Sequence, residues 1–185
     1  KCNVCLINIA EDKRSLIGSI RRLKSHPIKW FNENYSEGNI LKSLHLKGFD
    51  KRGLLFDISA NGSNLTGLLP ISEISEHCFV SSPECIFSHD TLFPLMIKEI
   101  DMDKCLIRLS LKDLFKHNIK RVNNLDYKEN YQGVVLGKKY RKTIIAITKI
   151  WVEGFFTSNK EYKVGEILEI HLISRNNNFP EFADE

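Results

Sequence analysis

Hydrophobic and polar residues alternate along much of the chain, with the period of two that is typical of half-buried β-strands. The first alternating segment is "KCNVCLINI" (1–9), and "SLIGSI" (15–20) follows it after a short charged turn. Two strands joined by a polar turn predict a β-hairpin. The next segment, 21–31, is interrupted by Pro27 and is therefore predicted to be a linker.

Five further strands are predicted between residues 38 and 111, in an order that indicates a small barrel. Three strands come first, and two more follow a polar stretch in which Ser72 can cap a short helical turn. The predicted ranges are 40–47, 53–59, 67–71, 91–100 and 106–111. Five strands with a short helical insert after the third are the content of a Greek-key barrel of the OB type.

The chain repeats itself. Residues 5–23 and 95–114 share one pattern: an apolar strand, an acid-containing turn, a second apolar strand and a basic tail. This internal repeat predicts that the chain opens inside the last hairpin of an earlier copy. A third, poorer copy is predicted over 130–174, but no fifth strand is predicted for it, because 175–185 has the composition of a tail.

The predicted fold is therefore all-β, with tandem five-stranded OB-type barrels. One barrel is expected to be complete, one to be a C-terminal fragment, and one to be divergent and incomplete. The expected divisions are a hairpin of a preceding domain (1–24), a linker (25–36), the complete domain (37–115), a basic linker (116–129), the incomplete domain (130–174) and a tail (175–185). The basic stretch 115–128 is expected to be either an extended linker or a helix.

Composition and charge narrow the function classes. Of the 185 residues 42% are hydrophobic and 27% are charged, which is typical of a globular protein. No apolar run approaches the ~20 residues needed to span a bilayer, so no membrane association is expected. The net charge is only +4, but basic residues gather in 13–29 and 116–142. Such clusters indicate a nucleic-acid or anionic partner, while a solvated Lys-rich surface is an equally open alternative.

No pattern of catalysis or metal binding is found. The sequence contains no nucleophile elbow, HExxH motif or Gly-rich phosphate loop, so we expect no enzymatic activity, no cofactor and no metal. Cys2 and Cys5 have zinc-like spacing, but no second pair completes a site, and they are predicted to be plain strand residues. Asp101 and Asp103 are expected to form a turn. The odd, scattered count of five cysteines favours free thiols in a reducing compartment.

Several motifs agree in order and spacing with a known family. Residues 67–75 read Gly-Leu-Leu-Pro-Ile-Ser-Glu-Ile-Ser, residues 53–58 read Gly-Leu-Leu-Phe-Asp-Ile, and Ile100-Asp101 precede Leu-Ile-Arg-Leu-Ser at 106–110. These motifs resemble the S1 RNA-binding domain, the OB-fold module named after small-subunit ribosomal protein S1. The resemblance covers 38–114 well, 1–24 as a domain tail and 130–174 weakly. It is greatest to the multi-repeat S1 proteins of bacteria, cyanobacteria and plastids.

The resemblance implies roles for the stretch 66–75. Leu68 and Ile71 are expected to fill the barrel, Gly67 to permit a close turn, and Ser72 to start the helix that closes one end. Only Pro70 stands where the family normally contacts RNA.

The chain also departs from the family. RNA-binding members present aromatic residues on the second strand and a His in the signature, as a stacking platform. The matching positions here hold Arg52, Leu55 and Pro70, and in the third copy Arg141, Ile144 and Thr157. The departure implies either weak, salt-sensitive RNA contact through basic residues or barrels that have turned toward a docking surface.

The remaining candidates for RNA contact are basic residues, with one aromatic among them. They are Lys42, Lys47, Lys51 and Arg52 on the first strand and the following loop, Arg108 on the last strand, and the loop residues Lys138, Lys139, Tyr140, Arg141 and Lys142. Trp151 is predicted to be a core residue and Trp30 to join two modules, although either ring could stack on a base. His45, His77 and His89 show no ligand spacing and are predicted to be ordinary surface or core residues.

The sequence thus predicts a non-catalytic RNA-binding component of the small ribosomal subunit. It would bind mRNA or rRNA during translation, beside other small-subunit ribosomal proteins, in a plastid stroma or a bacterial cytoplasm. Two alternatives stay open: the S1 portion of an RNA-processing nuclease complex, and part of a multi-repeat ribosome-assembly factor.

Overall fold

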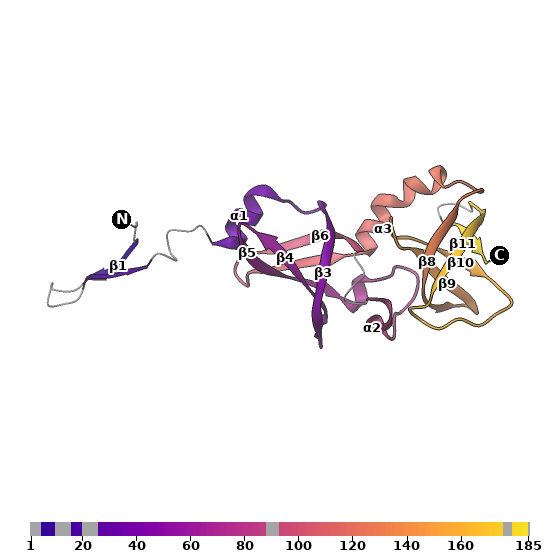
Figure 1. Ribbon diagram of the computed structural model, residues 1–185, viewed down its shortest axis with the longest axis horizontal. Helices are drawn as coiled ribbons and strands as arrows, with labels where there is room; N and C mark the ends of the chain where they lie inside the picture. Colours follow the sequence, from indigo (N-terminus) through magenta and orange to yellow (C-terminus); the bar gives the residue numbers. More distant parts are fainter. Residues whose placement is uncertain (1–4, 10–15, 20–25, 88–92, 176–178, 185) are drawn as a thin grey trace.

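The computed structural model describes the chain except for residues 1–4, 10–15, 20–25, 88–92, 176–178 and 185. The described residues form a separate two-stranded sheet followed by two closed five-stranded barrels, which lie side by side (Figure 1). We call them the middle barrel and the last barrel. The predicted all-β fold with tandem OB-type barrels is confirmed by this topology.

The N-terminal hairpin has the same irregularity as its predicted repeat. Its strands are β1 (Cys5–Ile9) and β2 (Leu16–Ser19), and their antiparallel register shifts between Leu6 and Asn8. The last hairpin of the middle barrel shifts between Ile97 and Glu99, at the equivalent place in the repeat. The shared bulge supports the repeat. The environment of Cys2 and Cys5 lies outside the described part of the chain, as does His89.

The middle barrel contains the five strands that were predicted along the chain. Strands β3, β4, β5, β7 and β6 are neighbours in that sequence, and the pairing of β5 with β7 is parallel. The insert after the third strand contains two short helices, close to where the polar stretch predicted one. The elements are β3 (Ile40–Asp50), β4 (Gly53–Ala60), β5 (Ser63–Pro70), η2 (Ile71–Glu73), α2 (Pro83–Ile86), β6 (Phe93–Asp101) and β7 (Leu106–Ser110).

The predicted linker at 25–36 is a helix instead. Helix α1 spans Pro27–Asn34, with Pro27 in its first turn. Proline is favourable there, since its missing N–H would have no partner inside the helix. Ile28 and Phe31, one helical turn apart, are fully buried against the middle barrel. Trp30, on the same helix, packs partly buried against this core.

The last barrel is closed, which corrects the prediction of an incomplete domain. A fifth strand, β12, lies parallel to β10 and antiparallel to β11, within the segment 175–185 that was predicted to be a tail. Phe182 of this strand is fully buried. The strands are β8 (Asn130–Lys139), β9 (Lys142–Ile147), β10 (Val152–Thr157), β11 (Ile167–Ser174) and β12 (Glu181–Ala183).

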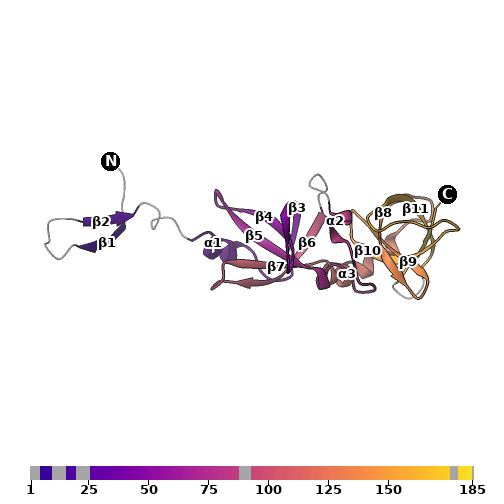
Figure 2. The same ribbon diagram turned by 90° about the horizontal axis from the view of Figure 1, so that it is seen from below.

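The predicted basic linker at 116–129 is largely helical. Helix α3 (Lys112–Asn118) continues into η3 (Ile119–Asn124), and both views show α2 and α3 between the two barrels (Figures 1 and 2). Val122 and Leu125 are buried in the same hydrophobic core that spans both barrels. The connection is therefore part of the packed structure.

Two roles that the S1 resemblance implied for 66–75 are wrong. Gly67 lies in the middle of β5, not at a turn, and a Cβ on it would come within 2.8 Å of the Ile58 and Leu109 side chains inside the barrel. Because strand residues alternate, Leu69 also points inward and Leu68 points outward.

The start of the insert differs as well. The short helix η2 begins at Ile71, one residue before Ser72, and Ile71 is only partly buried. The residues that fill this end of the core are Leu69 and Ile74, both fully buried.

Replacing Phe182 with alanine tests the fifth strand. We expect F182A to lower the free energy of unfolding by about 3–5 kcal/mol, because it leaves a cavity in the closed barrel. Chemical denaturation followed by circular dichroism measures the change. The control is I173A on neighbouring β11, a side chain that is 47% exposed and should cost below about 1 kcal/mol. If both variants lost equally little stability, 181–183 would not be a structural strand.

Candidate nucleic-acid interface

The outward face of the middle barrel carries two of the predicted residues, Lys47 and Arg108, on strands that β4 and β5 separate. A cross-strand row runs from Gly48 through Leu55 and Leu68 to Arg108 and Glu99, as the strand registers show. Lys47 lies beside this row on β3. The OB fold commonly binds oligonucleotides on this face and on its loops.

Surface acids pair with most of the candidate cations here. The Lys47 ammonium lies 3.2 Å from Asp57 Oδ1, and an Arg108 guanidinium nitrogen lies 3.2 Å from Glu99. Exposed pairs of this kind contribute only about 0–1 kcal/mol. A phosphate can therefore compete for either cation.

The turn after β3 holds Lys51 and Arg52. Arg52 donates to Asp50 Oδ2 from Nε at 3.2 Å and from a terminal nitrogen at 2.9 Å. These hydrogen bonds lower the pKa of the Asp50 carboxyl. Lys51 is exposed, as is Lys42 near the start of β3.

The second group of candidates forms the hairpin tip between β8 and β9. Lys139 and Lys142 face each other across a two-residue turn made of Tyr140 and Arg141. Tyr140 is 87% exposed, and the Lys139 ammonium lies 5.8 Å from its ring centroid. We call residues 138–142 the basic tip. It belongs to the last barrel, so the ten predicted residues fall into two groups on different barrels.

The basic tip is tied to its own barrel at both ends. Lys138 pairs with Glu161 at 2.9 Å, and Lys142 pairs with Glu181 at 3.3 Å. The Lys142 ammonium also lies 4.7 Å from the centroid of the Phe155 ring.

The face of the last barrel that corresponds to an OB ligand face is covered. Val134, Ala146 and Glu153 form an outward row across β8, β9 and β10, and each has no exposed surface. Ile144, which the S1 resemblance placed at a base-stacking position, is also fully buried. The last barrel therefore presents no open platform on its second and third strands.

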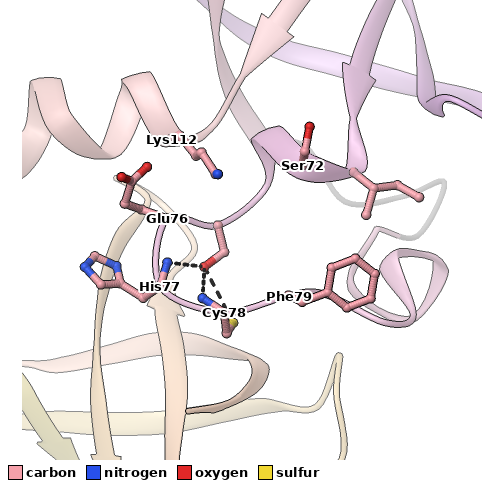
Figure 3. Close-up of a pocket in the computed structure, with 8 residues that line it drawn as sticks. Ser72, Glu76, His77, Cys78, Phe79 and Lys112 are labelled. Atoms are coloured by element: carbon pink, nitrogen blue, oxygen red, sulfur yellow. Dashed lines mark hydrogen bonds between the residues drawn. The ribbon is translucent and has the colours of Figure 1, made fainter.

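The middle barrel provides the cover through the segment after η2. Glu153 Oε2 accepts a hydrogen bond from Ser75 Oγ at 2.8 Å and lies 3.0 Å from His77 Nδ1, while Oε1 accepts from the Glu76 N–H at 3.3 Å. Ser75 Oγ in turn accepts from the N–H groups of His77 and Cys78, which holds the segment in a tight turn (Figure 3). Each oxygen of the buried carboxylate thus has a partner.

Trp151 completes the junction. It is fully buried, as predicted, but its ring packs against the middle barrel, with centroids 6.2 Å from Phe87 and 5.6 Å from Phe93. Its indole N–H donates to the Ile74 carbonyl at 3.3 Å, and Asn118 donates to the Ile150 carbonyl nearby. These contacts join the two barrels through side chains from both.

A cleft of about 310 Å³ opens beside this junction (Figure 3). Phe79 lines it and is 79% exposed, and Lys112 faces it from the start of α3. The sequence reasoning missed Phe79, whose only signal was an aromatic residue within a polar stretch. Its backbone lies next to β8, since a Cβ on Gly137 would lie 3.4 Å from the Phe79 carbonyl oxygen.

The cysteines and the aspartate turn singled out in the sequence have structural surroundings. Burial raises the pKa of the Cys78 thiol, and Cys78, Cys85 and Cys105 are free. Asp101 accepts hydrogen bonds from the backbone and side chain of Lys104 at 2.9 Å, as expected of a turn.

Within the described ranges, no three His, Cys, Asp or Glu residues gather as metal ligands. No helix among those described is long and apolar enough to span a membrane.

No family model matches the chain, and no curated protein matches it. The chain is similar to a solved multidomain protein with nucleic acid binding domains from Streptococcus pneumoniae TIGR4, with 14% identity and a TM-score of 0.47 over 82% of this chain and 54% of that one. It is also similar to Drosophila Unr CSD456, with 11% identity and a TM-score of 0.31 over 80% of this chain and 62% of that one. The chain thus spans less than two thirds of each of these proteins.

Removing the buried carboxylate tests the junction. We expect E153A to destabilise the protein by about 3 kcal/mol or more, because Ser75, His77 and the Glu76 N–H lose their shared partner inside the interface. Calorimetry should also show the single unfolding transition broaden or divide. The matched control is E161A, whose side chain is 90% exposed and forms a surface pair. Equal stability of the two variants would show that the buried network does not hold the barrels together.

Proposed function

We propose that this chain is a non-catalytic RNA-binding protein that contacts single-stranded RNA through the basic residues on the outward face of the middle barrel and through the basic tip. The observation that carries the proposal is the backbone of the tip. Tyr140 and Arg141 have φ values of +51° and +65°. A two-residue hairpin turn with positive φ at both positions strongly favours Asn-Gly, and other residues there are strained.

Strain of this kind persists where function requires the side chains. Tyr140 offers an exposed ring on which a base can stack, and Lys139 and Arg141 offer charge for the neighbouring phosphates. A ring set among cations is the combination that single-stranded nucleic-acid binders use. The tip connects the first two strands of its barrel, where the OB fold often places a binding loop.

The middle barrel supplies a second, electrostatic contact. Its cations at positions 42, 47, 51, 52 and 108 lie on the β3 strand, the adjoining turn and the outward row. Because the aromatic platform of S1-like domains is missing, these contacts would be independent of RNA sequence and sensitive to salt.

The finer proposal rests on the S1-like motifs at 53–58, 67–75 and 100–110. On this basis we propose that the RNA is mRNA or rRNA, that the particle is the small ribosomal subunit with its proteins, and that the compartment is a plastid stroma or a bacterial cytoplasm. The two rival assemblies are an RNA-processing nuclease complex and a ribosome-assembly factor.

Replacing the turn with Asn-Gly separates binding from stability. We expect Y140N/R141G to stabilise the protein by about 1–2 kcal/mol, because it relieves two strained residues. The same variant should weaken binding of a 12-nucleotide RNA by about 1–3 kcal/mol, because a stacking ring and a charge are lost. Thermal unfolding and fluorescence anisotropy at 50 mM salt measure the two effects.

Y127A is the matched control for the loss of a ring. Tyr127 is 48% exposed and lies against Arg175, away from the tip. It should leave RNA affinity unchanged. Unchanged affinity of Y140N/R141G would reject the tip as an RNA contact.

Sedimentation of the native protein tests the ribosomal assignment. We expect it to travel with small ribosomal subunits in a sucrose gradient at low salt, and weaker association at high salt would indicate phosphate-driven binding. Migration with a nuclease or with pre-ribosomal particles instead would favour one of the two rival assemblies.

A further inference from the structure

A groove of about 390 Å³ lies between α1 and the outward side of β3 and β4. It is distinct from the row of Leu55 and Leu68 and from the junction. Its volume is in the range of small-ligand pockets and can admit a nucleobase. The lining residues used below are Tyr35, Lys42, His45, Asp57 and Ser59.

One wall of the groove is a fixed aromatic surface. The Tyr35 ring stacks on Phe31, with centroids 4.6 Å apart and planes 19° apart, and Trp30 meets Tyr35 edge to face at 6.5 Å. Phe31 is fully buried, so it holds the wall against the barrel core. The wall supplies apolar contact for a flat ring and loses little entropy on binding.

The other wall of the groove is polar and combines one hydrogen-bond acceptor with several donors. Asp57 Oδ1 is enclosed and, in the described part of the chain, receives no hydrogen bond of good geometry, although the Lys47 ammonium lies 3.2 Å away as an ion pair. The Asp57 side chain is nevertheless 38% exposed, and Asp57 is one of the residues that line the groove. It offers an acceptor there. Lys42, His45 and Ser59 are exposed around it and can donate.

This arrangement discriminates between bases. A carboxylate accepts from an exocyclic amino group, as on cytosine, adenine or guanine. Uracil has no amino group, and its ring N–H lies between two carbonyl oxygens that a carboxylate repels. Donors beside the carboxylate can meet the ring nitrogen or carbonyl next to the amino group of cytosine or adenine.

We propose that the groove between α1 and β3–β4 is a base-recognition pocket that selects amino-bearing nucleobases of single-stranded RNA over uracil, with Asp57 as the specificity-determining residue. This inference rests on the proposed RNA-binding function and adds a sequence preference to it. Tyr35 supports the base from the side of α1, and Lys42 and Lys47 lie close enough to the groove to contact the adjoining phosphates.

The test compares fluorescein-labelled 12-nucleotide oligo(C), oligo(A) and oligo(U) on the whole chain by anisotropy at 50 and 150 mM salt. The wild type should bind oligo(C) or oligo(A) about three- to tenfold more tightly than oligo(U), the ratio expected of one or two net hydrogen bonds. The comparison of oligo(C) with oligo(A) distinguishes a pyrimidine from a purine pocket.

Two variants locate the preference. D57N should abolish it, because Lys47 holds the amide oxygen and leaves the NH₂ group, a donor, toward the groove. S59L keeps Asp57 but fills the groove from an exposed strand position, and it should also bring oligo(C) and oligo(A) down to the affinity of oligo(U). The matched control is D50N, which removes one paired carboxylate from the same barrel outside the groove and should keep the preference.

The outcomes separate the two proposals. Equal affinity of the wild type for all three oligomers, or a D57N protein with wild-type circular dichroism that keeps the preference, overturns the pocket and leaves general RNA binding intact. Failure of every oligomer to bind at 50 mM salt rejects the proposed function itself, and the pocket with it.

Discussion

Burying the Glu153 carboxylate in the last barrel carries a desolvation cost that only its hydrogen-bonding partners offset. Those partners, Ser75, Glu76 and His77, all belong to the middle barrel. The geometry of the junction follows from that requirement. Ser75 must point its hydroxyl at β10, so the segment after η2 must turn tightly, and the same turn lays Cys78 and Phe79 against β8. Trp151 then fills the apolar space beside the network. The two barrels are thereby joined by a polar centre with an aromatic border.

The junction between the barrels leaves different surfaces exposed on each of them. On the outward side of the last barrel Val134, Ala146 and Glu153 have no exposed surface, and the segment after η2 of the middle barrel covers Glu153, whereas Tyr140 at the basic tip is 87% exposed. On the outward row of the middle barrel Arg108 is exposed and Leu55 is half-buried, while Leu68 between them is buried. Both domains lack the aromatic residues of S1-like proteins, but the positions that lack them have different surroundings in the two barrels. Ile144 replaces a ring where a protein surface packs, while Arg52 and Leu55 replace rings where solvent remains.

The sequence predicted the strands of both barrels well, because alternation along 40–58 and 142–157 reports local burial. It missed β12, since three residues after Pro180 carry too little pattern to be recognised as a strand. It also missed α1, because Pro27 was read as an interruption rather than as a first-turn residue. The covered face could not be predicted from periodicity, which depends on neighbours along the chain. Glu153 was the available signal: a lone acid between the apolar residues of "WVEGFF" (151–156) indicates a buried, partnered carboxylate.

The type of connection between the barrels has a consequence for the RNA-binding function proposed above. Tandem domains on a flexible linker sample many separations, and the second contact forms at an effective concentration set by linker length. Here α3 and η3 pack into a core shared by both barrels. The distance between the middle-barrel face and the basic tip is therefore a property of the folded protein. If both surfaces bind RNA as proposed, their fixed separation favours RNA strands whose contour length matches it.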